Sequence, residues 1–249
     1  MTNRAGFDFS GATALVTGGT SGIGHATATL LRDCGAEVTI TGTKASAFDY
    51  DVDLTRMAYR QFNVTDSAQS DELASSFSTL DILINNAGAN FPGGLDEATV
   101  EGFTTSVDVN LLAPFRLTTA LHAALKSSAA AGGASVVMLA SMAAIRAVPM
   151  VPGYGAAKAG VLSLIRNLGV RWASDGIRIN AVVPGVTATR MTAPMDFVPE
   201  IKQEQLDHIP LGRFAEPVEI AAPILFLCSE NSSYCTGSAF VIDGGYSAL

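Results

Sequence analysis

The sequence contains little charge and few aromatic side chains. Charged residues make up 15% of its 249 positions, and acidic residues outnumber basic ones to give a net charge of -8. Because contacts with phosphates need clustered Lys and Arg, this balance argues against a nucleic-acid partner. No apolar run approaches the ~18 residues of a membrane span, and the first ten residues lack the pattern of a secretion signal. We therefore expect no membrane association.

Patterns of metal ligands and of disulfides are also missing. The three cysteines, Cys34, Cys228 and Cys235, are scattered and odd in number, and the three histidines lie far apart. Such cysteines are typical of free thiols in a reducing compartment. We expect a cytoplasmic protein without a metal site.

Small aliphatic residues are abundant. Hydrophobic residues make up 48% of the chain but aromatic residues only 7%, which suits helices packed closely on both faces of a sheet. Apolar runs predict strands at 12–17, 37–41, 59–64, 81–84, 134–140, 178–183 and 239–242. Helical patterns cover 25–34, 65–77, 103–126, 154–174 and 217–229. No repeat or linker interrupts them, so we expect one α/β domain over 1–249, with short helices at 190–212 forming a lid.

A glycine-rich turn follows the first predicted strand. Thr17 leads into Gly18-Gly-Thr-Ser-Gly22-Ile-Gly24, and a helical pattern follows. Glycines allow a sharp turn and a close approach to a ligand, and the helix N-terminus offers free N–H groups to a pyrophosphate. An ordinary glycine-rich turn is the alternative, but the strand before and the helix after favour nucleotide binding.

The second predicted strand carries information on the cofactor. It ends in Thr41-Gly42-Thr43-Lys44, without the acidic residue that binds a ribose 2′-hydroxyl and repels a 2′-phosphate. This favours NADP over NAD, although NAD remains possible. The acidic segment 49–53 would oppose a 2′-phosphate if it folded back, but a solvated surface loop is the preferred interpretation.

Other polar residues follow later strands, where open α/β sheets bind their ligands. Asn63 and Val64 are candidates for the adenine. Asn85-Asn86-Ala-Gly88 is either a turn or a wall of the ribose site. Residues 184–189 lie on the same side.

Tyr154 and Lys158 are four residues apart on a predicted helix and therefore share a face. A fixed ammonium lowers the pKa of a phenol, which could then exchange a proton with a carbonyl or alcohol oxygen. Ser141, at the end of a strand, could bond the same oxygen. The spacing alone also occurs by chance on exposed helices. Asn110, inside the predicted helix 103–126, is flanked by apolar residues and could face inward.

Together these motifs resemble the classical short-chain dehydrogenase/reductase superfamily, and in particular bacterial 3-oxoacyl-carrier-protein reductases. The resemblance extends from about residue 9 to 246. It implies a Rossmann-type doubly wound sheet of about seven parallel strands, an NAD(P)-dependent exchange of hydride with a ketone or secondary alcohol, and a homotetramer.

The resemblance also implies residue roles. Tyr154 is the acid/base, Lys158 holds the nicotinamide ribose, Ser141 polarises the substrate oxygen, and Asn110 orders a relay water. The cofactor site comprises Gly18, Thr20, Ser21, Gly22, Ile23, Gly24, Thr43, Asn63, Val64, Asn86, Tyr154, Lys158, Pro184, Gly185, Thr187 and Thr189. Two departures are Ser21, where NADP-specific relatives often carry Arg or Lys, and Asn63, where many carry Asp.

The substrate and two alternatives stay open. The apolar loop 142–153 and the Met- and Pro-rich lid favour an apolar substrate, such as a small ketone, a 3-oxoacyl thioester or a steroid-like alcohol; the same Met residues could equally be packing within the lid. A non-catalytic nucleotide sensor on this fold is a weaker interpretation, because Tyr154 and Lys158 are both present. An enoyl reductase or sugar-nucleotide epimerase fits less well with the Tyr–Lys spacing and the short chain.

Overall fold

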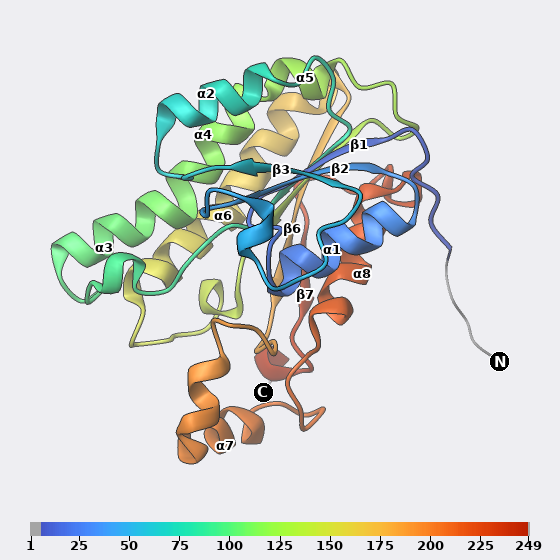
Figure 1. Ribbon diagram of the computed structural model, residues 1–249. Coiled ribbons are helices and arrows are strands. Elements are labelled where there is room, and N and C mark those ends of the chain that lie inside the picture. Colours follow the sequence, from blue (N-terminus) through green and yellow to red (C-terminus); the bar gives the residue numbers. More distant parts are fainter. Residues whose placement is uncertain (1–5, 249) are drawn as a thin grey trace.

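A seven-stranded parallel sheet forms the centre of the molecule (Figure 1). The computed structural model describes residues 6–248, and the strand order is β3-β2-β1-β4-β5-β6-β7. The strands are β1 (Thr13–Val16), β2 (Glu37–Gly42), β3 (Met57–Gln61), β4 (Ile82–Asn85), β5 (Ala134–Leu139), β6 (Ile177–Pro184) and β7 (Ala239–Ile242). The predicted doubly wound α/β fold is confirmed. The chain reverses direction across the sheet between β1 and β4, which creates a crevice at their carboxyl ends.

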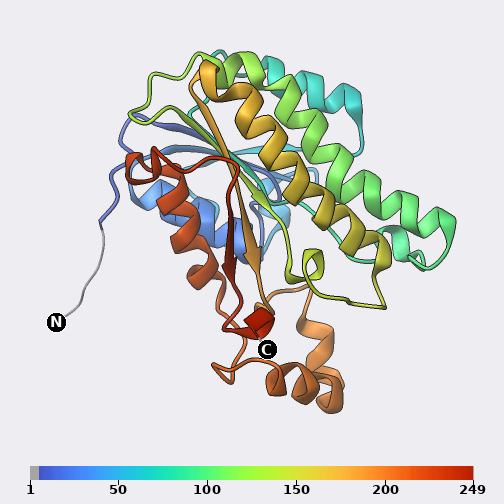
Figure 2. The ribbon, with the colours of Figure 1, turned by 180° about the vertical axis from the view of Figure 1, so that it is seen from behind.

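Helices cover both faces of the sheet (Figures 1 and 2). On one face, α1 (Gly22–Asp33) packs against α8 (Pro217–Cys228). The other face carries α2 (Ser67–Ser75), α4 (Ala113–Ala120), α5 (His122–Lys126) and α6 (Pro152–Trp172), with α3 (Val100–Val107) against α6. Because both faces are covered, every residue of β4, β5 and β6 is buried.

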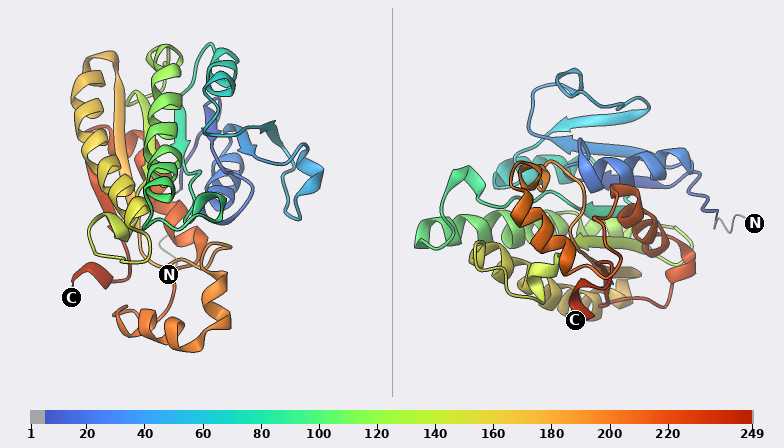
Figure 3. Two further views of the ribbon diagram at one scale, coloured as in Figure 1. Left: turned by 90° about the vertical axis from the view of Figure 1, so that its left-hand side faces the viewer. Right: turned by 90° about the horizontal axis from the view of Figure 1, so that it is seen from below.

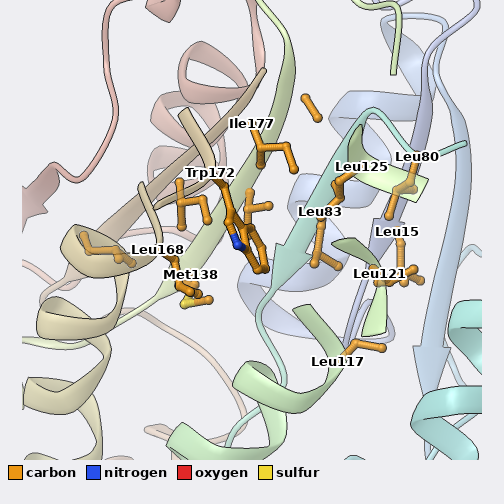
Figure 4. Close-up of a cluster of buried hydrophobic side chains, with 14 of the residues drawn as sticks. Leu15, Leu80, Leu83, Leu117, Leu121, Leu125, Met138, Leu168, Trp172 and Ile177 are labelled. Carbon is orange, nitrogen blue, oxygen red and sulfur yellow. The ribbon is translucent and has the colours of Figure 1, made fainter. Parts of the chain in front are cut away.

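Two apolar clusters separate these layers. The larger one joins the α4–α6 face to the sheet and includes Trp172 of α6 and Met138 of β5 (Figure 4). The second lies under α1 and α8. Packing on both sides fixes the strand ends, and so it fixes the loops that carry the polar residues.

The predicted continuous helix 103–126 is wrong. It begins earlier, at Val100, and a π-helical turn at Asp108–Leu112 separates α3 from α4. Pro114 has no N–H to donate to the carbonyl of Asn110, so the α-helical pattern cannot pass this point. The N–H of Ala113 bonds to Asp108 instead, five residues back.

The segment after β6 projects below the carboxyl end of the sheet (Figure 3). It holds a short 3₁₀ helix at Ala193–Phe197 and helix α7 (Pro199–Asp207), as the Met- and Pro-rich pattern at 190–212 predicts. Among the helices of residues 6–248, none is long and apolar enough to cross a bilayer.

Candidate active site

The glycine turn joins β1 directly to α1. Gly18 and Gly22 have φ values of +64° and +53°, and residues other than glycine rarely adopt such values. Ser21 is the N-cap of α1, and its side chain makes no capping hydrogen bond. The first N–H groups of α1 are therefore free of a side-chain cap, as an anion site at a helix N-terminus requires.

Asn86, which follows the neighbouring strand β4, holds this turn in place by hydrogen bonds. Its side-chain Nδ2 donates to the carbonyls of Thr17 (3.0 Å) and Gly18 (3.1 Å). Gly24 faces the same amide, because a Cβ at Gly24 would lie 2.3 Å from Nδ2 of Asn86. The crevice between β1 and β4 is thus held in one shape by backbone and amide contacts.

The loop after β2 folds back over the end of its strand. The hydroxyl of Tyr50 accepts the N–H of Lys44 (2.9 Å), and the ammonium of Lys44 lies 4.8 Å from the Tyr50 ring centroid. The Lys44 ammonium also donates to the carbonyl of Asp49. The Asp49 carboxylate accepts the N–H of Ser46 (2.9 Å), so Lys44 and Tyr50, rather than this acid, line the cleft.

Tyr154 lies in the first turn of α6, and its side chain is buried among the strand ends. Its phenol hydrogen-bonds the hydroxyl of Ser141, which follows β5. Lys158 lies one turn further along α6, with its ammonium 5.5 Å from the Tyr154 ring centroid. That ammonium donates to the carbonyl of Leu139 at 2.6 Å. The structure therefore brings Ser141, Tyr154 and Lys158 together.

The pKa values differ from the expectation for this cluster. Burial raises the pKa of Tyr154, the bond from Ser141 lowers it, and the negative charge of Glu97 raises it, so that the net change is upward. The pKa of Tyr154 is therefore raised, and not lowered toward neutrality as its lysine neighbour had led us to expect. Burial lowers the pKa of Lys158 itself to about 8.

Asn110 faces inward, as its apolar neighbours predicted, and is fully buried. Its side chain accepts the N–H of Ala89 (3.1 Å) and donates to the carbonyl of Ala89 (2.9 Å). A Cβ at Gly88 would lie 2.7 Å from Oδ1 of Asn110 and 3.4 Å from Nζ of Lys158. Asn110 thus fixes the segment after β4 beside Lys158.

One cleft of about 820 Å³ connects these groups. It is lined by every predicted site residue except Gly24 and Asn110, which stand behind it and support Asn86 and Ala89. The predicted residues on its wall are Gly18, Thr20, Ser21, Gly22, Ile23, Thr43, Asn63, Val64, Asn86, Ser141, Tyr154, Lys158, Pro184, Gly185, Thr187 and Thr189.

The other end of the cleft is mainly apolar. The residues there are Pro92, Met142, Val148, Val151, Met191 and Met195, with Asn90, Arg190 and Gln205 among them. Thr192 ties this end to the strand loop, because its hydroxyl donates to the carbonyl of Thr187 at 2.6 Å.

Several residues of the site were missed from the sequence, and Tyr50, Gln205 and Glu97 are three of them. Tyr50 and Gln205 line the cleft, and Glu97 is fully buried beside Tyr154. Tyr50 and Gln205 come from a surface loop and an amphipathic helix with no motif around them. Glu97 stands between Asp96 and the exposed Glu101 in an acidic stretch, which the sequence does not distinguish from a solvated one.

Comparisons with known proteins agree with this geometry. A family model described as enoyl-(acyl carrier protein) reductase matches residues 18–247. Cyclohexanol dehydrogenase of Acinetobacter is 33% identical over 96% of this chain and 96% of its own. A 3-oxoacyl-[acyl-carrier-protein] reductase of Chlamydia trachomatis is 32% identical over 94% of this chain and 96% of its own.

A solved structure extends the likeness to three dimensions. A putative 2-deoxy-D-gluconate 3-dehydrogenase of Agrobacterium tumefaciens, crystallised with bound NADP, is 31% identical and superimposes with a TM-score of 0.86 over 99% of this chain and 100% of that one. The chain therefore belongs to the classical short-chain dehydrogenase/reductase superfamily and is an NAD(P)-dependent oxidoreductase of CH–OH and C=O groups.

Proposed function

We propose that Tyr154 is the catalytic acid/base, that Ser141 positions the substrate oxygen, and that Lys158 holds the nicotinamide ribose. The single observation that carries this assignment is the hydrogen bond between the Ser141 hydroxyl and the buried phenol of Tyr154 at the wall of the cleft, with Lys158 one turn away. A substrate carbonyl placed between the two hydroxyls would accept a hydrogen bond from each.

Proton movement follows from these contacts. During ketone reduction the Tyr154 hydroxyl gives its proton to the substrate oxygen, and during alcohol oxidation the phenolate takes it back. Ser141 stabilises the negative charge that develops on that oxygen. We propose that Asn110 supports a proton relay, because it holds Ala89 and lies close to Gly88 and Lys158.

The nicotinamide cofactor supplies and accepts the hydride. The residues present fit such a group: Gly18 and Gly22 turn without a Cβ, the uncapped start of α1 suits a pyrophosphate, and Asn86 stands at the switch point. We propose Thr20, Ser21 and Ile23 for the phosphates, Asn63 and Val64 for the adenine, and Pro184, Gly185, Thr187 and Thr189 for the nicotinamide.

We propose a preference for NADPH over NADH. Thr43 and Lys44 line the cleft where β2 ends, and the carboxylate of Asp49 bonds to the backbone of its own loop. A cation at this end favours a 2′-phosphate. In a direct comparison, the dissociation constant for NADH should be larger than that for NADPH.

We propose a small or medium apolar ketone, or the matching secondary alcohol, as substrate, with segment 190–212 of a single domain acting as its lid. Met142, Val148 and Val151 line the cleft, and so do Met191 and Met195 of the proposed lid. Two relatives are named for a secondary alcohol, cyclohexanol, and for a 3-oxoacyl group, which supports this class. A steroid-like alcohol is the larger candidate of the same class.

A substrate panel with Tyr154→Phe as the control tests the proposal. Cyclohexanone, acetoacetyl-CoA, a steroid ketone and crotonyl-CoA are each followed at 340 nm with NADPH. We expect reduction of an apolar ketone, and a fall in kcat of at least about 10³-fold in Tyr154→Phe with little change in NADPH affinity. Undiminished turnover in the variant, or turnover of crotonyl-CoA alone, would contradict the assignment.

We also propose a cytoplasmic homotetramer. Cys34, Cys228 and Cys235 are all free thiols, as in a reducing compartment. Five exposed apolar side chains belong to α3, α4, α6 and the π-helical turn, which lie on one side of the sheet: Val100, Phe103, Leu112, Phe115 and Val170. Such a face suits pairing with a second copy.

A further inference from the structure

A carboxylate with no exposed surface lies beside the first turn of α6. Glu97 is 0% exposed, and each of its oxygens accepts a backbone N–H: Oε1 from Phe91 at 2.9 Å and Oε2 from Tyr154 at 2.6 Å. Burying a carboxylate is costly unless hydrogen bonds satisfy it. Its position between two segments of the cleft therefore calls for a role.

On one side, Glu97 caps α6. The N-cap residue of this helix is Val151, which has no side-chain acceptor. Glu97 supplies one from outside the helix, and a negative charge at a helix N-terminus is favourable. The N–H that it accepts belongs to Tyr154, so the capping contact fixes the residue that carries the phenol.

On the other side, Glu97 holds a strained loop. Phe91 has φ 46° and ψ 52°, a left-handed conformation that costs a bulky residue energy and that is further disfavoured before Pro92. Its neighbours Asn90, Pro92 and Gly93 line the cleft. Strained backbone of this kind persists where the surroundings hold it.

Two glycines make room for Glu97 and its neighbours. A Cβ added at Gly153 would lie 3.1 Å from Oε2 of Glu97 and 3.0 Å from Cα of Phe103. A Cβ at Gly102 would lie 2.0 Å from the carbonyl of Asp96 and 3.0 Å from the N atom of Glu97. Two glycines thus admit the carboxylate at a fixed position.

We propose that Glu97 is a positioning residue: its carboxylate ties the 90–93 segment to the first turn of α6 and so sets the phenol of Tyr154 at the cleft. The inference rests on the proposed role of Tyr154. Two charged groups lie near this phenol, Glu97 and Lys158, and the charge of Glu97 raises the pKa of Tyr154. Geometry and charge can therefore be separated by two substitutions.

Glu97→Gln keeps the shape, removes the charge and leaves one of the two N–H groups without an acceptor. Glu97→Asp keeps the charge but is one methylene too short to reach both. Glu101→Gln, an exposed acid on α3, is the matched control. For each protein we would measure the melting temperature, the Kd for NADPH, and kcat, KM and the pH profile for the best ketone and alcohol pair.

We expect kcat to fall at least tenfold in both Glu97 variants, because the phenol is displaced, and the Kd for NADPH to stay within threefold of wild type. KM should rise by a smaller factor than kcat falls, because the 90–93 segment also lines the cleft. The pH midpoint of alcohol oxidation should move down in Glu97→Gln only. If Glu97→Gln does not fold, Glu97→Asp decides. A kcat within twofold of wild type in a folded Glu97 variant, or a loss confined to KM, overturns the role of Glu97. A wild type inactive on every ketone overturns the proposed function as well.

Discussion

At the scale of one residue, Lys158 is a group of the site whose burial lowers the stability of the folded protein. Its ammonium is buried, and the hydrogen bond to the carbonyl of Leu139 does not replace the water it loses. Burial accordingly lowers its pKa from 10.5 to about 8. The charged form of Lys158 is therefore less favourable in the folded protein than in the unfolded chain.

Replacing this residue should stabilise the protein while abolishing activity. A pKa difference of this size corresponds to roughly 3 kcal/mol, and losing the bond to Leu139 removes about 1 kcal/mol. We expect Lys158→Met to raise the free energy of unfolding by about 2 kcal/mol at pH 7, measured by urea denaturation.

The sign of its pH dependence follows from the lowered pKa. Between pH 8 and 10.5 the unfolded state binds more protons than the folded state, so the wild type gains stability as pH rises through this window. The advantage of Lys158→Met should shrink from pH 8 to pH 10. A constant difference would mean that the ammonium is not the cause.

Lys44 is the residue on which the cofactor preference depends. It lines the cleft after β2, and its ammonium is held near the Tyr50 ring. We expect Lys44→Ala to raise the Kd for NADPH about tenfold, in line with one charge-assisted contact of roughly 1.5 kcal/mol, and to leave the Kd for NADH unchanged. Lys126→Ala, on α5, is the control. Equal losses for both cofactors would argue against contact with a 2′-phosphate.

At the scale of elements, the packing of α1 depends on Gly24, which does not line the cleft. A Cβ at Gly24 would lie 2.3 Å from Nδ2 of Asn86 and 2.4 Å from the carbonyl of Gly18, and backbone cannot yield cheaply. Gly24 therefore permits the close packing between the glycine turn and the segment after β4.

We expect Gly24→Ala to destabilise the protein by about 1–3 kcal/mol, even though alanine is the better helix former. NADPH affinity should fall more than tenfold, because Gly18 and Asn86 must both move. Gly6→Ala is the control, since its Cβ would meet nothing within 4 Å. Thermal unfolding measures the change in stability, and fluorescence titration measures the change in NADPH affinity. If the Asn86 side chain simply rotated away, both values would stay near wild type and the prediction would be wrong.

Elements differ in how well the sequence foretells them. Strand β5 appears within one residue of its predicted ends, because a buried parallel strand is a run of mainly apolar residues. The π-helical turn at Asp108–Leu112 was not foreseen, although Pro114 was a local cue. The contacts of Asn110 with Ala89 and of Glu97 with Phe91 join elements by tertiary packing, which no periodicity records.

At the scale of the whole molecule, the outer face of α3, α4 and α6 is the surface to explain. Val170 of α6 is 80% exposed and Phe115 of α4 is 38% exposed. Helices α4 and α6 lie on the same side of the sheet (Figure 2). Several exposed apolar side chains on the helices of one side suit an interface.

We expect Phe115→Asp to lower the oligomeric state, because a buried charge at a two-fold interface would face its own copy. Sedimentation velocity of wild type should give a tetramer and that of the variant a smaller species. Phe48→Asp, at a side chain that is 98% exposed on the loop after β2, is the control. Unchanged sedimentation in Phe115→Asp would place the interface elsewhere.

The strand order of the sheet has a consequence for how the chain reaches its native state. Each strand is parallel to its neighbours, so no hairpin can start the sheet, and β1 must find β4 across the whole β2–β3 excursion. Pairing of strands so far apart in the sequence requires a long loop to close before stabilising contacts form, and this slows folding. Half-assembled chains with unpaired strand edges would then be the species that chaperones meet.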